Sequence, residues 1–250
     1  MPAYARLSTL FYDLDKPVAP QASLEFYLRR AQEAPGPILE PMCGSGRFLI
    51  PLLERGLDVE GVDDSPSMLQ ACRDRCHARG LSPTLYEQSL EALDLPRRYG
   101  LAMIPEGSFC LLTDPARARA CLERLHSVVL PGGRLVFEVE QLLPLTVSRF
   151  EPAGRRLVNL PEGGQLILTW SGRYSPTERV SRSENRYQVL KEGNVVETEV
   201  EEFDRRYYEP AEVAELLKRS GFRDIRMTKL DGSAPPTETD ESFVVECVRD

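Results

Sequence analysis

The chain has 250 residues and a formal net charge of −8, with 31 lysine and arginine residues against 39 aspartate and glutamate residues. This length is enough for one α/β domain with an insertion and a sizeable core. Proteins that bind the nucleic-acid backbone are usually basic, so we expect no nucleic-acid partner. No apolar run is long enough to span a bilayer, and Met1 to Ala3 begin no signal peptide. We therefore expect a cytoplasmic protein without a membrane partner.

The first 37 residues precede the predicted sheet. Leu24, Tyr27, Leu28 and Ala31 recur at helical spacing and predict an amphipathic helix that ends at a Pro-Gly-Pro breaker. We treat residues 1–37 as an N-terminal lid and helix.

A strand, a glycine turn and a helix are predicted in succession from residue 38. Ile38 and Leu39 follow the breaker and are apolar, as in a strand that is buried on both faces. Gly44 and Gly46 lack a Cβ, so the backbone there turns sharply and approaches a ligand closely. The apolar residues of 48–53 then fall at helical spacing.

A second strand begins at Val59 and ends at the acidic pair Asp63 and Asp64. In a right-handed β-α-β unit, the glycine turn and this acid lie side by side at the carboxyl ends of adjacent parallel strands. A carboxylate there accepts hydrogen bonds from both hydroxyls of a ribose. The stretch therefore predicts a site for a nucleotide-bearing cofactor.

The acid at the end of the first strand distinguishes between cofactors. Dinucleotide-binding folds use Gly-x-Gly-x-x-Gly, whose glycines and following helix accommodate a pyrophosphate. Here Leu49 stands at the third glycine position, and Glu40 precedes the turn. A carboxylate at this place repels a pyrophosphate and suits an ammonium group, which disfavours a nicotinamide dinucleotide.

Residues 40–46 resemble motif I of the class I S-adenosylmethionine-dependent methyltransferases, usually Glu/Asp-x-Gly-x-Gly-x-Gly, with Met42 in place of the first glycine. The resemblance implies S-adenosylmethionine as cofactor and S-adenosylhomocysteine as product, and it places Asp63 at the ribose. It implies further cofactor contacts from Glu40, Met42, Cys43, Gly44, Gly46 and Asp64. We expect Met42 to fit beside the cofactor without a left-handed backbone.

The next helix carries one cofactor candidate and a pair of cysteines. Ser65 supplies its N-cap, followed by a proline at the first helical position. The thioether of Met68 lies one turn beyond the ribose acid, where it packs either on an adenine ring or into the core. Cys72 and Cys76 share a helix face, but no second ligand pair accompanies them. Burial is therefore favoured over metal binding, and we predict no metal site.

A third strand is predicted at 84–88, and the same resemblance places the residues after it near the adenine. Family members commonly have an acid at the position of Ser89. Because serine is shorter and uncharged, we expect backbone groups near Leu90 to hold the base, unless Glu91 substitutes for the acid.

A near-continuous apolar run from Leu101 to Pro105 predicts a central parallel strand. Ligands bind beyond the carboxyl ends of such strands, so we expect Pro105 to contact the cofactor, and Glu106 is a candidate general base or substrate anchor. An exposed glutamate without a role is the alternative. A helix at 115–129, a Pro-Gly-Gly turn and a strand at 134–140 come next, and Glu138 is a further catalytic candidate.

In the resembling family, an N-terminal segment closes over the cofactor, and an aromatic hydroxyl often reaches it. Tyr12 is the candidate here, both for this contact and for a catalytic role. The alternative is that Tyr12 and its aromatic neighbours only pack the segment onto the sheet.

From residue 141 to 208 the pattern changes to consecutive strands. Strands are predicted at 165–170, 179–190 and 195–207, the last two joined by a Glu-Gly-Asn turn. They form an antiparallel meander inserted between units of the core. Similar inserts in small-molecule methyltransferases cap the active site or form a dimer contact, and the sequence leaves a cap and a homodimer both open.

Residues 209–250 are predicted to complete the core. A helix at 210–220 precedes strands at 222–230 and 242–248, a pair that places one antiparallel strand at the edge of the methyltransferase sheet. With 38–140 as the cofactor-binding part, the fold class is α/β. We expect a Rossmann-like seven-stranded class I methyltransferase sheet with helices on both faces and an inserted antiparallel β meander.

The leading interpretation is a methyltransferase that moves a methyl group from S-adenosylmethionine to N or O of a small metabolite by in-line displacement. The Asn-Pro-Pro-Tyr motif of amino-methylating nucleic-acid enzymes is absent, and the acidic charge also favours a small acceptor. One alternative is a non-enzymatic regulatory protein that binds S-adenosylmethionine, and another is an NAD(P)-dependent oxidoreductase.

Overall fold

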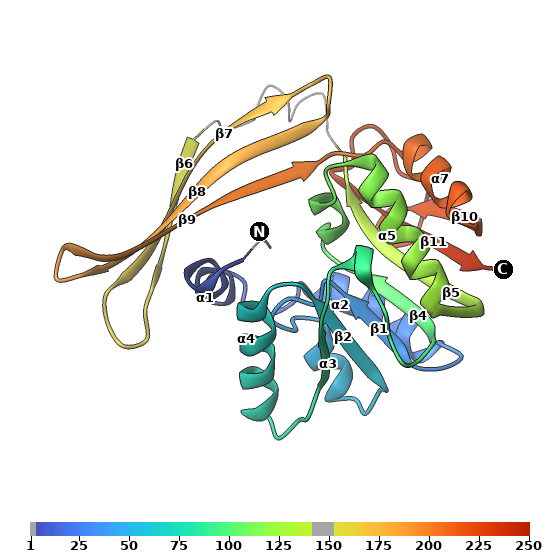
Figure 1. Cartoon of the computed structure of the whole chain (residues 1–250), viewed down its shortest axis with the longest axis horizontal. Helices are drawn as coiled ribbons and strands as arrows, with labels where there is room; N and C mark the ends of the chain where they lie inside the picture. Colours follow the sequence, from blue (N-terminus) through green and yellow to red (C-terminus); the bar gives the residue numbers. More distant parts are fainter. Residues whose placement is uncertain (1–3, 142–152) are drawn as a thin grey trace.

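The computed structural model describes residues 4–141 and 153–250, which form a seven-stranded sheet flanked by helices and a second sheet of four strands (Figure 1). The part of the predicted insert at 142–152 lies outside the described residues. No helix within the described ranges combines the length and the apolar character needed to cross a bilayer.

The seven-stranded sheet confirms the predicted α/β fold class. In spatial order its strands are β10 (Phe222–Thr228), β11 (Ser242–Arg249), β5 (Val129–Glu140), β4 (Tyr99–Ile104), β1 (Ile38–Pro41), β2 (Val59–Asp63) and β3 (Thr84–Glu87). All neighbours are parallel except β11, which runs antiparallel to both β5 and β10. The antiparallel strand therefore lies second from the edge, because β10 pairs with its outer side.

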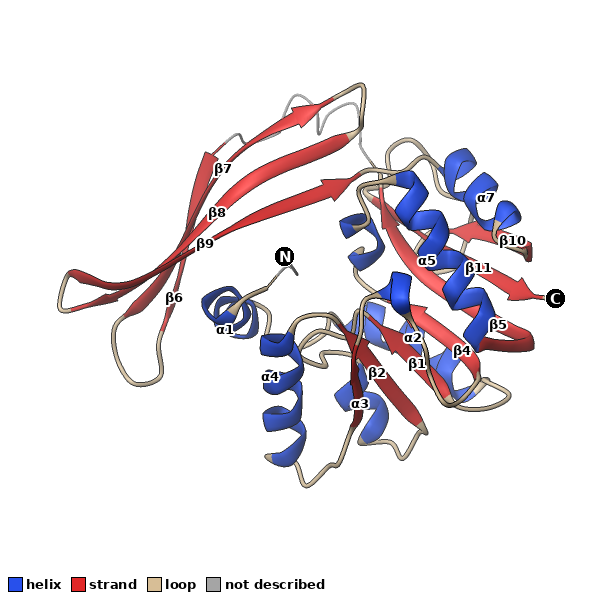
Figure 2. Ribbon diagram, in the orientation of Figure 1, coloured by secondary structure: helices blue, strands red, loops and turns tan. Residues whose placement is uncertain are grey.

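Helices cover both faces of this sheet (Figure 2). One face carries α2 (Gln21–Gln32), α3 (Leu49–Leu53) and α4 (Pro66–His77), and the other carries α5 (Pro115–Val128) and α7 (Pro210–Arg219). Side chains of successive strand residues point to opposite faces of the sheet. Ile38 therefore packs with α2, α3 and α4, and Leu39 packs with α5 and α7. Cys72 and Cys76 on α4 are fully buried and unbridged, as the helix pattern predicts.

The second sheet is an antiparallel meander that extends away from the core (Figure 1). It consists of β6 (Ala153–Asn159), β7 (Gln165–Ser175), β8 (Val180–Lys191) and β9 (Asn194–Arg206), paired in chain order. The three predicted strands are present. The fourth strand, β6, was not predicted, because its sequence lacks a clear apolar and polar alternation.

A helix that the sequence did not predict, α1 (Arg6–Asp15), joins the two sheets. Its residues Leu7 and Phe11 share a buried cluster with Leu166 of β7 and Tyr187 of β8. At its other end, Asp13 forms an ion pair of 3.0 Å with an arginine of α4. The helix therefore packs on the inserted sheet while it is also held to the core. Two short 3₁₀ turns, Leu90–Ala92 and Ser108–Leu111, come after β3 and β4.

Candidate functional site

The turn between β1 and α3 is bonded directly to the end of β2. Oδ2 of Asp63 accepts a hydrogen bond of 2.8 Å from the N–H of Gly44, and the carbonyl of Val62 accepts one of 3.0 Å from Cys43. The other carboxylate oxygen of Asp63 accepts from the N–H of Ser65 at 2.9 Å. The predicted proximity of the glycine turn and the acid is confirmed.

Met42 at the start of this turn has a left-handed backbone with a φ of 58°, so the expectation that it avoids this conformation is wrong. Gly44 and Gly46 come next with φ values of 53° and 81°. The bonds from Cys43 and Gly44 to β2 set the path of the turn, and residue 42 must adopt it whatever its side chain. Such a conformation costs a non-glycine residue about 1–3 kcal/mol.

Gly46 lies behind the turn and lines no described cavity. A Cβ at this position would lie 2.6 Å from Sγ of Cys72 and 3.2 Å from the side chain of Ile50. Close packing against α4 therefore explains this glycine. Its contact with a cofactor stays a prediction.

Two buried carboxyl groups face the turn. Glu40 is the last residue but one of β1 and has 2% of its surface exposed, and its Oε2 has no hydrogen-bond partner in the described part of the chain. Burial, and next the neighbouring Asp63, raise the pKa of Glu40 well above its usual range. Burial also raises the pKa of Asp63 from 3.8 to about 6, although hydrogen bonds from Ser65 and Gly44 oppose this shift. A bound cation would favour the ionised forms of both groups.

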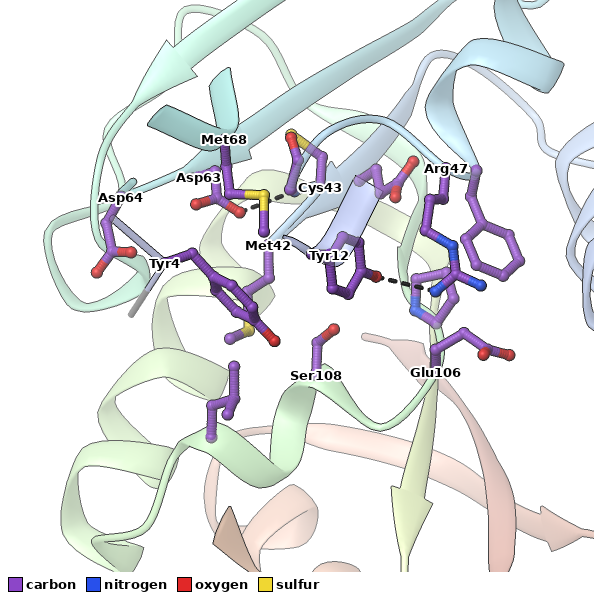
Figure 3. Close-up of a pocket in the computed structure, with 15 residues that line it drawn as sticks. Tyr4, Tyr12, Met42, Cys43, Arg47, Asp63, Asp64, Met68, Glu106 and Ser108 are labelled. Carbon is purple, nitrogen blue, oxygen red and sulfur yellow. Dashed lines mark hydrogen bonds between the residues drawn. The ribbon is translucent and has the colours of Figure 1, made fainter. Parts of the chain in front are cut away.

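A cavity of about 90 Å³ lies over the turn (Figure 3). The predicted site residues that line it are Tyr12, Glu40, Met42, Cys43, Gly44, Asp63, Asp64, Met68, Pro105 and Glu106. The lining residues that were not predicted are Tyr4, Arg47, Phe48, Ser108 and Leu111. The structure thus gathers most of the predicted residues around one space, and their individual roles stay predictions.

A smaller cavity of about 60 Å³ adjoins the first, since Met42, Asp63 and Asp64 line both. Ser89 and Leu90, the residues predicted near the adenine, line only this second cavity. Pockets for drug-sized ligands usually measure about 300 Å³ or more. A nucleoside-sized ligand that spans both cavities therefore requires the side chains around them to move.

Arg47 is a buried cation that the sequence analysis missed. It comes directly after the glycine turn and is 7% exposed. Its Nη1 donates to the hydroxyl of Tyr12 at 2.9 Å, and its Nε and Nη2 donate to the carbonyl of Val18 at 3.2 and 2.9 Å. The guanidinium therefore fastens the N-terminal segment to the turn. A basic residue immediately after the glycines is the signal that points to it.

Tyr4 and Tyr12 form the outer wall of the cavity, with ring centroids 5.5 Å apart in an edge-to-face arrangement (Figure 3). The carbonyl of Tyr4 accepts a hydrogen bond of 2.5 Å from the hydroxyl of Ser65, close to Asp63 in the chain. Its N–H donates to Oε2 of Glu201 on β9 at 3.2 Å. One residue of the N-terminal segment thus contacts both the start of α4 and the inserted sheet.

The two carboxylate candidates for catalysis lie in different surroundings. Glu106 comes after β4 with a φ of 55° and lines the cavity, and within the described ranges its carboxylate has no hydrogen bond or ion pair. Glu138 lies inside β5, is 8% exposed and lines neither cavity. Burial raises the pKa of Glu138 to about 7. The structure therefore brings Glu106 to the site and leaves Glu138 in the core behind it.

Comparison with known proteins agrees with this geometry. Residues 38–133 match the model of a family described as "Methyltransferase domain". Over 101 residues the chain is 34% identical to the 23S rRNA (uracil(1939)-C(5))-methyltransferase RlmD of Klebsiella pneumoniae. That match covers 40% of this chain and only 22% of the length of that enzyme.

Solved structures resemble the chain over nearly its whole length. An S-adenosylmethionine-dependent methyltransferase from Clostridium acetobutylicum has a TM-score of 0.78 at 16% identity, with 96% of each chain covered. The sugar N-methyltransferase KedS8 from Streptoalloteichus has a TM-score of 0.75 at 21% identity, with 100% of this chain and 95% of that chain covered. The chain therefore has the fold of the class I S-adenosylmethionine-dependent methyltransferases and carries a methyltransferase domain in residues 38–133.

Proposed function

We propose that this protein transfers a methyl group from S-adenosylmethionine to a nitrogen of a small amine. The observation that carries the proposal is the buried carboxyl of Glu40, whose Oε2 has no partner among the described residues, next to Asp63 at the glycine turn. A cofactor that bears both an ammonium group and a ribose would use these two acids. A dinucleotide would instead bring a pyrophosphate to the same place, where a carboxylate repels it.

The residues around the two cavities fit the parts of this cofactor. Glu40 would hold the ammonium group, and Asp63 has lone pairs left for the ribose hydroxyls. Arg47 is the buried cation of the wall and would face the carboxylate of the methionine moiety. Ser89 and Leu90 would lie near the adenine in the second cavity.

When bound, S-adenosylmethionine supplies an electrophilic methyl group, whose C–S bond breaks with its electron pair left on sulfur as an amine lone pair forms the new C–N bond. The chain itself must hold the amine in line with that methyl group. Glu106, which lines the cavity, would accept an N–H of the amine and take up the proton that the methylated nitrogen releases. Tyr4 and Tyr12 would exclude water from the reacting atoms.

The choice of a small amine draws on two kinds of support. One structural relative is named a sugar N-methyltransferase, which has an amine-type acceptor. The relative named as an rRNA methyltransferase matches only a minority of this chain, and the net charge of −8 disfavours an RNA acceptor. The cytoplasmic location and a homodimer through the inserted sheet stay predictions.

Turnover tests this proposal and separates it from a regulatory role. With S-adenosylmethionine and a panel of small amines and alcohols, we expect S-adenosylhomocysteine to form with an amine. Glu106→Gln should lower kcat/KM about 10- to 100-fold, the usual effect of losing a charge-assisted hydrogen bond, and leave cofactor affinity unchanged. Glu162→Gln, an exposed glutamate between β6 and β7, is the matched control.

Two outcomes contradict the proposal. Binding of S-adenosylmethionine without turnover of any amine or alcohol would identify a regulatory protein. Binding of NADH in its place would identify an oxidoreductase.

A further inference from the structure

A third cavity, which we name the arm cleft, lies between α1 and the inner face of the inserted sheet. It measures about 330 Å³, within the usual range for small-molecule sites. Its walls include the aromatic side chains of Phe11, Trp170, Tyr187 and Phe203, and its polar groups include Ser183 and Asn185. The cofactor cavities do not use any of these residues.

The arm cleft adjoins the larger cofactor cavity. Tyr4 and Tyr12 line both spaces, so the edge-to-face pair of tyrosines is the partition between them. A ligand in the arm cleft therefore reaches the cofactor cavity where Tyr12, Arg47 and Glu106 meet in Figure 3. This is the side of the cavity beyond the end of β4, where an acceptor is expected in a sheet of this topology.

The charges around this opening are unevenly matched. Arg205 is neutralised by Glu140, with 3.1 Å from Nη1 to the carboxylate, and Arg156 is neutralised by Asp15 at 3.2 Å. Lys16 lines the arm cleft, and the described parts of the chain offer its side-chain ammonium no hydrogen bond and no ion pair. Its ammonium lies 5.7 Å from the centre of the Tyr12 ring.

Lys16 and Glu106 are thus an unpaired cation and an unpaired carboxylate on the two sides of Tyr12. They influence each other electrostatically but lie too far apart for a direct ion pair. An acceptor that carries an amine toward Glu106 and an anion toward Lys16 would satisfy both charges at once. An acceptor without an anionic group would leave the Lys16 ammonium without an ion-pair partner.

The aromatic walls add a requirement of shape. A Cβ on Gly154 would come within 2.1 Å of the indole of Trp170, so the glycine of β6 lets the indole lie directly against the strand. Trp170 still lines the arm cleft and is only half-buried. The flat ring of a ligand would gain binding energy from stacking or edge contacts with such side chains.

We propose that the arm cleft is the acceptor site and that the acceptor is a flat-ringed amine that also carries an anionic group, either a carboxylate or a phosphate. This inference rests on the proposed methyltransferase function. It makes Lys16 a specificity-determining residue, since this side chain would contact the anion of the acceptor and not the reacting nitrogen.

The test uses matched ligands and calorimetry on the full chain with saturating S-adenosylhomocysteine. Tyrosine is compared with tyramine, which lacks the carboxylate, and pyridoxamine 5′-phosphate is compared with pyridoxamine, which lacks the phosphate. In at least one pair, the member that carries the anionic group should bind about tenfold or more tightly, the usual effect of a charge-assisted contact. The pair that discriminates identifies the anion.

Variants and a local probe complete the design. Lys16→Gln should reduce the tenfold preference to threefold or less, whereas Lys191→Gln at the distant β8–β9 hairpin should keep it. Trp170 is the only tryptophan in the chain, so its emission, excited at a wavelength that tyrosine does not absorb, reports a ligand in the arm cleft. We expect tyrosine to change this emission if the carboxylate pair is the one that discriminates.

The inference is overturned if no ligand of the four binds, if tyramine and pyridoxamine bind as tightly as the partners that carry the carboxylate or the phosphate, or if Lys16→Gln keeps the preference. The binding of S-adenosylhomocysteine alone, measured first and in the Lys16→Gln variant as well, separates the two claims. If the product binds and the anionic amines are not preferred, only the inference about the arm cleft fails. If the product does not bind, the proposed function fails.

Discussion

Three residues that line the cavity over the glycine turn have left-handed backbones although none is a glycine. Tyr4, Met42 and Glu106 have φ values of 68°, 58° and 55°. Strained backbones of this kind persist where surrounding contacts hold them, and they gather at ligand sites. At Met42 the contacts are the hydrogen bonds of the next two residues to β2.

This strain predicts that, at position 42, a glycine variant is more stable than an alanine variant, the reverse of the usual order. Met42→Gly and Met42→Ala both remove the thioether, but only glycine adopts a left-handed backbone without cost. We expect the glycine variant to have the higher free energy of unfolding by roughly 1 kcal/mol, measured by urea denaturation. An alanine variant as stable as the glycine variant, or more stable, would show that residue 42 is not strained.

The buried acids predict the pH dependence of cofactor affinity. In the proposed site, Asp63 must be ionised to accept two ribose hydroxyls, and burial raises its pKa to about 6. Affinity for S-adenosylmethionine should be highest above pH 7 and fall about tenfold for each pH unit below 6. Calorimetry between pH 5 and 8 measures this, and a constant affinity over the range would contradict it.

The raised pKa of Asp63 makes the stability of the free protein depend on pH in the opposite direction from the cofactor affinity. Because the folded pKa of Asp63 lies above its ordinary value of 3.8, the native state holds this proton more tightly than the unfolded state. The contribution of Asp63 to the free energy of unfolding therefore decreases as the pH rises from about 4 to about 6. Asp63→Asn should remove both this contribution and most of the pH dependence of binding.

At the scale of single residues, the sequence predicted the positions that motif spacing determines. Glu40, Gly44 and Asp63 were placed at strand ends by the β-α-β pattern, and the cavity brings these three residues together. The backbone of Met42 was not predicted correctly, because a methionine does not signal a left-handed conformation. Arg47 was missed because its partners, Tyr12 and Val18, belong to a segment whose position the sequence does not specify.

Among the elements, α1 shows why some helices cannot be predicted from their own sequence. Its N-cap residue, Ala5, makes no side-chain hydrogen bond, and its first turn contains no acid. The cap comes instead from Glu199 on β9, whose carboxylate accepts from the N–H groups of Leu7 and Ser8 at 3.0 and 2.9 Å. A carboxylate at this end also interacts favourably with the helix dipole.

Removing that distant cap should loosen α1. Glu199→Ala is expected to lower the free energy of unfolding by about 1–2 kcal/mol, the usual cost of losing an N-cap, and to speed proteolysis within Arg6–Asp15. Glu197→Ala is the matched control on the same strand, since Glu197 pairs with Arg6 at the surface and should cost less than about 0.5 kcal/mol. Equal effects of the two substitutions would contradict the capping role.

The strands with a clear sequence pattern were predicted more accurately than the others. Apolar runs located β1 and β4, the β-α-β pattern with its acidic end located β2, and the Glu-Gly-Asn turn located the β8–β9 hairpin. The start of β5 was placed late, because Val129 already pairs with Tyr99 before the Pro-Gly-Gly turn, and pairing resumes at Arg134.

For the whole molecule, the order of elements determined the seven-stranded sheet, since parallel strands with intervening helices have few permitted topologies. The place of the inserted sheet could not be predicted from the sequence. It depends on the cluster of α1 with β7 and β8 and on the bonds of Tyr4 to Ser65 and Glu201. Most of these contacts join residues separated by more than 150 positions in the chain, and they create the arm cleft.

The central claim is that the cavity over the glycine turn binds S-adenosylmethionine through Asp63, and calorimetric titration with and without Asp63→Ala tests it most directly. Asp58→Ala, at an exposed aspartate that pairs with Arg97 just before β2, is the control. We predict micromolar binding, a free energy of about −8 kcal/mol, retained in the control and weakened about 100-fold in Asp63→Ala. No binding by the wild-type chain, or binding that Asp63→Ala leaves unchanged, would contradict the claim.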